Sequence, residues 1–272
     1  VTFLRTLDHT KARLNIVNGW NDSFVTTTSV LNSTIVPLTL FDGANDRISG
    51  TDSTVGAIDG KSFMFSAWAE FNNDGGSEYY FTTTSSRFRV ERGSDNKIHV
   101  VAENSSNVQI ANVSSTNTVT ISSGLTHLLV AVDMANQVIQ ILIDGVLETN
   151  IVTTAIANDT IDFTAGTMWV GGDTGDVARF DGKMGQFWLT NEYLDMSVTA
   201  NIRKFINADL TPVDFGTTGS TPTGTQPRIF LNNQADTFQN NLGSGGNFTE
   251  SGQLIDGGYI GDKIYSSTNF SN

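Results

Sequence analysis

The sequence predicts an all-β protein built as a two-sheet antiparallel sandwich, and three observations support this prediction. Short runs with apolar residues at alternating positions recur along the chain, which is typical of strands. Turn-forming residues separate the runs, as in Asn72–Ser77 and Asp144-Gly145. The composition agrees, because 26 glycines and 38% hydrophobic residues suit sheets and turns better than a disordered chain.

The middle of the chain carries the clearest strand signals. Apolar residues alternate over Phe63–Phe71, which predicts one long strand. The next strand is expected to begin at Tyr79-Tyr80-Phe81. Two further runs, Phe88–Val90 and Ile98–Ala102, flank a turn at Gly93–Asn96 and predict a hairpin with one charged and one buried face.

More strands are expected farther along. Val108–Ile110 and Val119–Ile121 predict two short strands. Leu128–Val132 is apolar at every position, which is typical of a strand covered on both sides. Asp144-Gly145 follows the alternating run Ile139–Ile143 and is a strong hairpin signal, because both turn residues need a positive φ.

One short helix is expected after the strands. Val198, Ile202 and Ile206 recur at helical spacing, and Asp195 or Ser197 can cap the helix N-terminus. An extended tail rich in glycine and threonine follows this helix.

The pattern divides the chain into three segments. Residues 1–36 form an N-terminal arm or edge strand, and residues 37–196 form the sandwich. Residues 197–272 hold the helix and the extended tail, which is expected to pack on the sandwich or on neighbouring subunits. Because edge strands must be covered or blunted, we expect the chain to associate with copies of itself.

The formal net charge of −13 limits the partners of this protein. An acidic surface repels the phosphates of nucleic acids and of anionic lipids, so we expect neither nucleic-acid binding nor attachment to such membranes. No apolar run is long enough for a membrane-spanning helix, so no membrane insertion is expected. The chain has no cysteine, which excludes disulfides and thiolate metal sites.

The tripeptide Phe-Asp-Gly occurs twice, at Phe41-Asp42-Gly43 and at Phe180-Asp181-Gly182. In each copy a stretch of apolar residues is followed directly by Asp-Gly, which is a turn signal. We therefore expect the chain to reverse sharply beside a buried phenylalanine at both places.

Four segments with recognisable motifs follow one another along the chain. Phe41–Ile48 has Phe-Asp-Gly and then Asn-Asp, and Phe63–Phe71 carries Trp68. His127–Leu147 ends in a strand, Asp-Gly and a strand, and Val170–Leu194 holds a glycine pair and the second Phe-Asp-Gly. In this order they resemble a concanavalin A-like, laminin-G-like domain. The resemblance implies a two-sheet jelly roll that binds surfaces more often than it catalyses.

The later part of the chain carries a second resemblance. Asn201–Leu254 contains Ile202-Arg203-Lys204-Phe205, Pro212-Val213-Asp214, Gly219–Gly224 (GSTPTG) and Gly243–Thr249 (GSGGNFT). This stretch resembles a tail that follows such domains in structural proteins of tailed bacteriophages. The resemblance implies a place on the surface of a virion, on the head or on the tail.

Catalysis is not expected. Glycanases of this family need paired carboxylates, usually on one strand as Glu-x-Asp-x-x-Glu. No such cluster occurs, and the nearest pair, Glu70 and Asp74, is divided by the turn at Asn72-Asn73. The three histidines do not accompany a Gly-x-Ser-x-Gly elbow, and we expect His127 to have a structural role.

We expect no metal ion and no other cofactor. Zinc would need histidines or cysteines close in sequence, and none are. Asp173 and Asp176, and Asn45-Asp46 in the first turn, offer oxygen ligands of the kind that calcium prefers. Aspartate is also the common residue of turns, where it bonds its own backbone.

Sugar recognition would use an exposed aromatic ring beside polar side chains. The predicted ligand-binding residues are Tyr79, Tyr80, Asn73 and Asp74. The alternative is that the aromatic residues fill the core. Other aromatic candidates are Trp20 and Tyr193, whereas Trp68 and Trp188 are expected in the core or on the sheet surface.

The leading hypothesis is a non-enzymatic phage virion protein that displays its jelly roll on the particle surface and binds host-surface polysaccharide. Its partners would be other virion proteins, copies of itself and that polysaccharide. A head-decoration or head-fibre protein with a purely structural role is the alternative. A polysaccharide depolymerase is a third hypothesis, disfavoured by the missing carboxylate pair.

Overall fold

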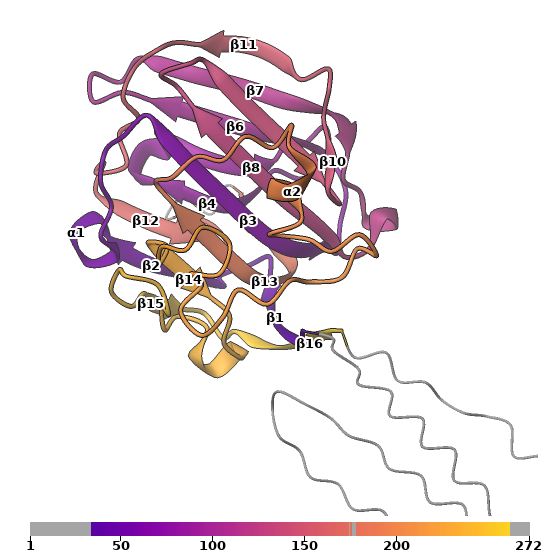
Figure 1. Ribbon diagram of the computed structural model, residues 1–272. Coiled ribbons are helices and arrows are strands. Elements are labelled where there is room, and N and C mark those ends of the chain that lie inside the picture. The colour runs from indigo at the N-terminus through magenta and orange to yellow at the C-terminus, as the bar shows by residue number, and fades with distance from the viewer. Residues whose placement is uncertain (1–33, 174, 176–177, 262–272) are drawn as a thin grey trace, which may run out of the picture.

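The computed structural model describes residues 34–261, except residues 174, 176 and 177. The described part forms two antiparallel sheets stacked face to face (Figure 1), so the prediction of an all-β sandwich is confirmed. The helices are short: α1 (Asp52–Val55) and α2 (Thr199–Ile202) are the α-helices of this part of the chain. None of the helices described is long and apolar enough to cross a membrane.

Each sheet has eight strands in the described part. The first sheet runs, in spatial order, through β10 (Val146–Leu147), β9 (Val138–Ile143), β8 (Thr126–Asp133), β3 (Ser62–Phe71), β13 (Asp181–Thr190), β1 (Val36–Asp42) and β16 (Ile255–Ile260), with β14 (Ile229–Leu231) also beside β13. The second sheet runs through β11 (Val152–Ile156), β7 (Gln109–Thr118), β6 (Lys97–Glu103), β5 (Phe88–Arg92), β4 (Glu78–Thr83), β12 (Thr167–Val170), β2 (Arg47–Thr51) and β15 (Thr249–Ser251).

The two Phe-Asp-Gly motifs lie side by side. β1 and β13 pair so that Asp42 faces Asp181, and the rings of Phe41 and Phe180 meet edge-on at 5.6 Å. Gly43 turns the chain with a φ of 70°, as expected. The second expected reversal is wrong, because Asp181-Gly182 begins β13 itself.

A packing constraint explains the glycine in the second motif. A Cβ atom on Gly182 would lie 2.0 Å from the carbonyl oxygen of Glu70 on the neighbouring strand β3. The glycine therefore permits a close approach of two strands rather than a turn.

Aromatic rings fill the space between the sheets. Phe63 of β3 meets Phe88 of β5 at 4.6 Å, and Phe65 meets Phe187 of β13 at 5.1 Å. The inward face of β3 and the inward face of the β5–β6 hairpin are buried as the alternation predicted. The strand expected to be covered on both sides, β8, is buried on both.

A second hydrophobic cluster covers the outer face of the first sheet. The C-terminal segment (residues 197–261 of the described part) crosses in front of β3, β8 and β13 (Figure 1). Phe205 packs edge-on against Trp188 at 5.3 Å, and the indole N–H of Trp188 donates to the carbonyl oxygen of Gly219 at 2.7 Å. The cluster comprises Met64, Trp68, Leu129, Ala131, Leu142, Trp188, Met196, Ile202, Phe205, Ile206, Phe215 and Phe230.

Several local expectations need correction. The cap residue of α2 is Val198, and no side chain caps this helix. Asp195 instead accepts bonds from the backbone and hydroxyl of Ser197 in a turn of its own. Val119–Ile121 is not a strand, because β7 is long and a 3-10 turn follows it at Ile121–Ser123. The short helix α1 was missed.

The described part begins and ends at one corner of the first sheet. Val36 of β1 pairs with Ile260 of β16, the edge strand. The expectations for residues 1–33 and 262–272, including Trp20 as a sugar-binding residue, lie outside the described residues.

Candidate functional site

The predicted sugar-binding tyrosines lie on opposite faces of β4. A bulge in the pairing of β4 with β5, between Tyr79 and Phe81, turns both Tyr80 and Phe81 into the core. Tyr80 is fully buried, with its ring 5.6 Å from that of Phe65, so it has no face open to a sugar and this prediction is wrong. Tyr79 faces outward but is only 8% exposed, and its hydroxyl contacts that of Ser86 at 3.3 Å.

Asn73 and Asp74 organise a buried arginine. Arg92, at the inward-facing end of β5, has no exposed surface. Its guanidinium donates to the carbonyl oxygen of Asn73 at 2.8 Å and to Asp74 at 3.2 Å, and it stacks on the ring of Phe71 at 4.1 Å. The described contacts of Asn73 and Asp74 are therefore structural, and their part in ligand binding stays a prediction.

Glu78 completes this buried cluster. Its carboxylate lies 3.3 Å from the guanidinium of Arg92. Burial raises the pKa of Glu78 to about 7, and the attraction of Arg92 opposes that rise only in part. Sequence reasoning missed this pair. The signal in the sequence was Arg92, a cation at the third inward-facing position of the alternating strand, after Phe88 and Val90.

Two of the aspartates considered for calcium accept hydrogen bonds from the protein backbone. Asp46 accepts from the amide of Asp42 at 3.0 Å. It also accepts from the amide of Gln253 at 2.7 Å. Over the residues that the structure describes, no group of three or more His, Cys, Asp or Glu is placed to hold a metal ion. Asp173 accepts from the amide of Gly175, and Asp176 lies outside the described residues.

A buried serine–histidine pair lies under the C-terminal segment. The hydroxyl of Ser66 and Nε2 of His127 are 2.9 Å apart, and the imidazole lies 4.9 Å from the ring of Trp68. Burial lowers the pKa of His127 to about 3, so the ring is neutral. Both side chains are fully buried, so no substrate can reach the pair.

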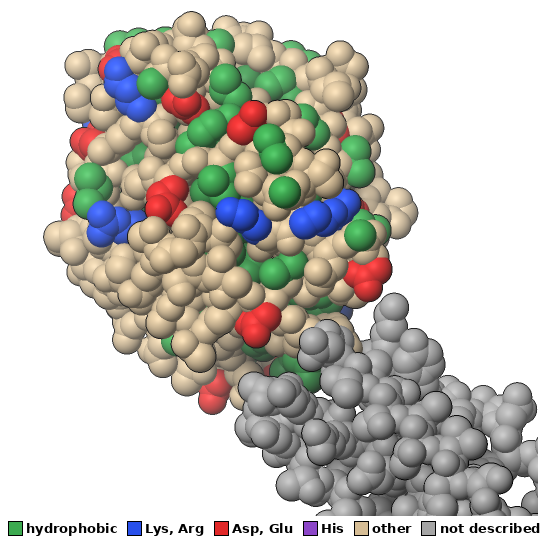
Figure 2. Space-filling model, viewed as in Figure 1, with side chains coloured by type: hydrophobic (Ala, Val, Ile, Leu, Met, Phe, Trp, Pro, Cys, Tyr) green, Lys and Arg blue, Asp and Glu red, His purple; other side chains and the backbone are tan. Residues whose placement is uncertain are grey.

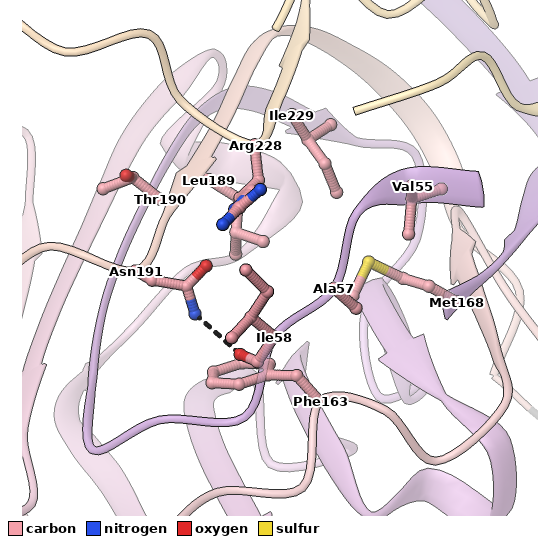
Figure 3. Close-up of a pocket in the computed structure, with 10 residues that line it drawn as sticks. All are labelled: Val55, Ala57, Ile58, Phe163, Met168, Leu189, Thr190, Asn191, Arg228 and Ile229. Carbon is pink, nitrogen blue, oxygen red and sulfur yellow. Dashed lines mark hydrogen bonds between the residues drawn. The ribbon is translucent and has the colours of Figure 1, made fainter. Parts of the chain in front are cut away.

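One small cavity lies between the ends of the sheets (Figure 3). Apolar side chains such as Phe163, Met168 and Leu189 surround it, and Asn191 at its rim donates to the carbonyl oxygen of Ile58 at 3.1 Å. Its volume of about 10 Å³ is close to that of a single water molecule. It is too small for an organic ligand.

A larger groove lies on the outer face of the second sheet, where β12, β2 and β15 adjoin. Thr167 of β12 pairs with Thr51 of β2, and Thr249 of β15 pairs with Ser49. Ile48 points into the core, so the alternation of β2 turns Ser49 outward. The groove measures about 230 Å³ and is lined by Ser49, Gly50, Thr51, Thr54, Thr167, Asn247 and Thr249.

Several polar groups of this groove have no hydrogen-bond partner in the described part of the chain. They are the hydroxyls of Ser49, Thr167 and Thr249 and the side-chain N–H₂ of Asn247. The Asn247 amide is oriented by its oxygen, which accepts from the backbone of Asn241 at 3.0 Å. We call these seven lining residues the hydroxyl groove. Sequence reasoning missed it, because exposed serines and threonines are common on strands.

An indole borders the hydroxyl groove. Trp169 follows Thr167 by two positions on β12 and pairs with Ser49 on β2, so it shares their face of the sheet. Only 8% of Trp169 is exposed. The groove therefore offers hydrogen bonds along its floor, and Trp169 adjoins it on the same face of the sheet.

Several solved structures are similar to this chain. A "putative carbohydrate binding protein" from Bacteroides ovatus matches with a TM-score of 0.54 at 13% identity, over 88% of this chain and 64% of that one. A SAP-like pentraxin from Limulus polyphemus matches with a TM-score of 0.44 at 13% identity, over 61% and 81% of the two chains. Domains LG4-5 of the mouse laminin α1 chain match with a TM-score of 0.42 at 12% identity, over 68% and 47%.

At 13% identity the likeness to the Bacteroides protein shows the fold alone. The matched region spans less than two thirds of the Bacteroides protein and of the laminin fragment. No curated protein matches this sequence. A family model described as the concanavalin A-like lectin/glucanases superfamily matches residues 42–198, more than half of the chain. The chain belongs to the concanavalin A-like lectin/glucanases superfamily, in its laminin-G-like form.

Proposed function

We propose that this protein is a non-catalytic carbohydrate-binding domain and that the hydroxyl groove is its binding site. The observation that carries the proposal is the set of unpartnered polar groups in the groove, namely three hydroxyls and one amide. A hydroxyl both donates and accepts hydrogen bonds, as sugar hydroxyls do, so the two surfaces are complementary. The groove volume of about 230 Å³ suits one or two units of a longer chain.

The position of the groove supports the proposal. The second hydrophobic cluster covers the outer face of the first sheet over β3, β8 and β13. In the described part, no comparable cluster lies on the outer face of the second sheet. Figure 2 shows the covered face, on which acidic and basic side chains are interspersed among uncharged ones.

The charged groups support a non-enzymatic role. Glycoside hydrolysis needs an acid and a second carboxylate across a cleft. No carboxylate lines the hydroxyl groove. On the same sheet Glu91 is paired with Arg89 at 3.1 Å, and on the first sheet Glu70 is paired with Lys183 at 3.1 Å.

We further propose that the domain is displayed on a bacteriophage particle, where it adheres to host-surface polysaccharide beside other virion proteins and copies of itself. The resemblance of Asn201–Leu254 to the tails of phage structural proteins supports this placement. A head-decoration role without a ligand is the alternative. Cryo-electron microscopy of the particle, together with the glycan-binding assay, distinguishes adhesion from decoration. Copies in an icosahedral array and an absence of glycan binding favour decoration.

Binding to immobilised polysaccharides tests the carbohydrate proposal. We expect the protein to bind at least one neutral polysaccharide from a broad panel, and the double variant Thr167→Val/Thr249→Val to bind it at least tenfold more weakly. Thr153→Val is the matched control, because Thr153 is exposed on β11 of the same sheet, away from the groove. Absence of binding across the panel, or equal loss in the control, refutes the assignment. Release of reducing ends from a bound polysaccharide would instead support a depolymerase.

A further inference from the structure

The hydroxyl groove has no charge of its own. Its lining consists of five hydroxyl-bearing side chains, one amide and one glycine. Anionic sugar groups, such as carboxylates and sulfates, are normally held by arginine, lysine or clustered backbone amides. Within the groove lining there is no such cation.

The charges closest in sequence to the lining are mostly acidic. Asp52 follows Thr51. Glu250 follows Thr249, but it pairs with the core residue Ile48, so it lies on the opposite face of the sheet from the groove. The Glu250 carboxylate accepts from the amide of Leu254 at 3.0 Å, and that of Asp52 accepts from the amide of Ser53 at 2.6 Å.

Cations on the same face include Arg47 of β2 and Arg89 of β5, and Arg89 is paired with Glu91. Arg47 precedes Ser49 by two positions on β2, and it pairs across to Ser251 of β15. It does not line the groove, and it already has an interaction within the protein. Its charge is also outweighed at longer range by a net charge of −13 over the whole chain.

From this distribution we infer that the hydroxyl groove selects uncharged saccharides and discriminates against acidic ones. The inference rests on the proposed carbohydrate-binding function and adds the class of ligand. A neutral sugar exchanges hydrogen bonds with the unpartnered hydroxyls of Ser49, Thr167 and Thr249. A sulfated or uronic sugar presents its charge to a lining that has no cation to neutralise it, next to the acidic residue Asp52.

The test compares two ligands that differ only in charge. The neutral polysaccharide that binds best in the panel is measured against its own sulfated derivative at low ionic strength. We expect the sulfated form to bind at least tenfold more weakly. Added salt should narrow this gap, because it screens repulsion, and should leave binding of the neutral form unchanged.

A charge variant locates the effect. Asp52→Asn keeps an oxygen that can accept from the Ser53 amide but removes the negative charge. We expect it to bind the sulfated form several-fold more tightly and the neutral form as the wild type does. Asp236→Asn is the matched control, because Asp236 is an exposed aspartate outside the groove lining.

The outcomes separate this inference from the proposed function. If no polysaccharide of the panel binds, the function fails, and the inference fails with it. If the sulfated form binds as tightly as the neutral form or more tightly, the function stands and the selectivity is refuted. Weakening of sulfated-form binding by salt would also refute it, since it would indicate attraction through Arg47.

Discussion

The C-terminal segment can be tested as part of the folded core by removing one of its aromatic rings. Phe205 is fully buried in the second cluster, with its ring 5.3 Å from that of Trp188 and 5.7 Å from that of Phe215. Replacing a buried phenylalanine by alanine costs about 3–5 kcal/mol, because apolar area is lost and a cavity remains. The loss of two edge-on ring contacts places Phe205→Ala within that range, at about 4 kcal/mol.

Urea denaturation followed by tryptophan fluorescence measures this loss. For a domain of this size, about 4 kcal/mol corresponds to a fall in Tm of roughly 10 °C. Val198→Ala is the control: Val198 is 47% exposed, so we expect a change within about 0.5 kcal/mol. A loss below about 1 kcal/mol for Phe205→Ala would show that the segment is only loosely attached to the sheet.

Three further predictions concern stability. Burial raises the pKa of Glu78 from 4.5 to about 7, so the native state binds the carboxyl proton of Glu78 more tightly than the unfolded chain does. The free energy of unfolding should therefore fall by at most about 3 kcal/mol as the pH rises from 4.5 to 7. The Glu78→Gln variant, measured over the same pH range, should lack that decline. Gly182→Ala should prevent normal folding, judged by circular dichroism, because its Cβ would strike the carbonyl of Glu70; a native-like spectrum and Tm would contradict this. Asp74→Ala should lower the free energy of unfolding, measured by urea denaturation, by about 1–3 kcal/mol, because it removes a partner of buried Arg92. It should leave polysaccharide binding unchanged. A selective loss of binding would instead show that Asp74 belongs to the binding site.

The fold was predictable because its strongest signals are local. Alternation over Phe63–Phe71 follows from the two-residue period of a strand, and Asp144-Gly145 takes the positive φ values that its hairpin turn requires. The second Phe-Asp-Gly misled for a non-local reason. Its glycine is needed by the backbone of β3, which lies more than a hundred residues away in the sequence.

The candidate site was harder to predict, because strand registers decide it. A bulge in β4 turned Tyr80 into the core, and a bulge has no dependable sequence signal. The hydroxyl groove depends on the pairing of Ser49 with Thr249 and of Thr51 with Thr167, from three distant segments. Each of these residues alone is an ordinary polar strand residue.

The pairing of Val36 with Ile260 has a practical consequence for protein engineering. Directly opposed residues of antiparallel strands have Cα atoms about 5 Å apart, so the first and last strands of the described fold place Val36 and Ile260 next to each other. The folded unit can therefore be spliced into an exposed loop of an unrelated carrier without stretching that carrier. New ends could be opened in a surface turn such as Gly93–Asn96 once the old ones are joined by a short peptide.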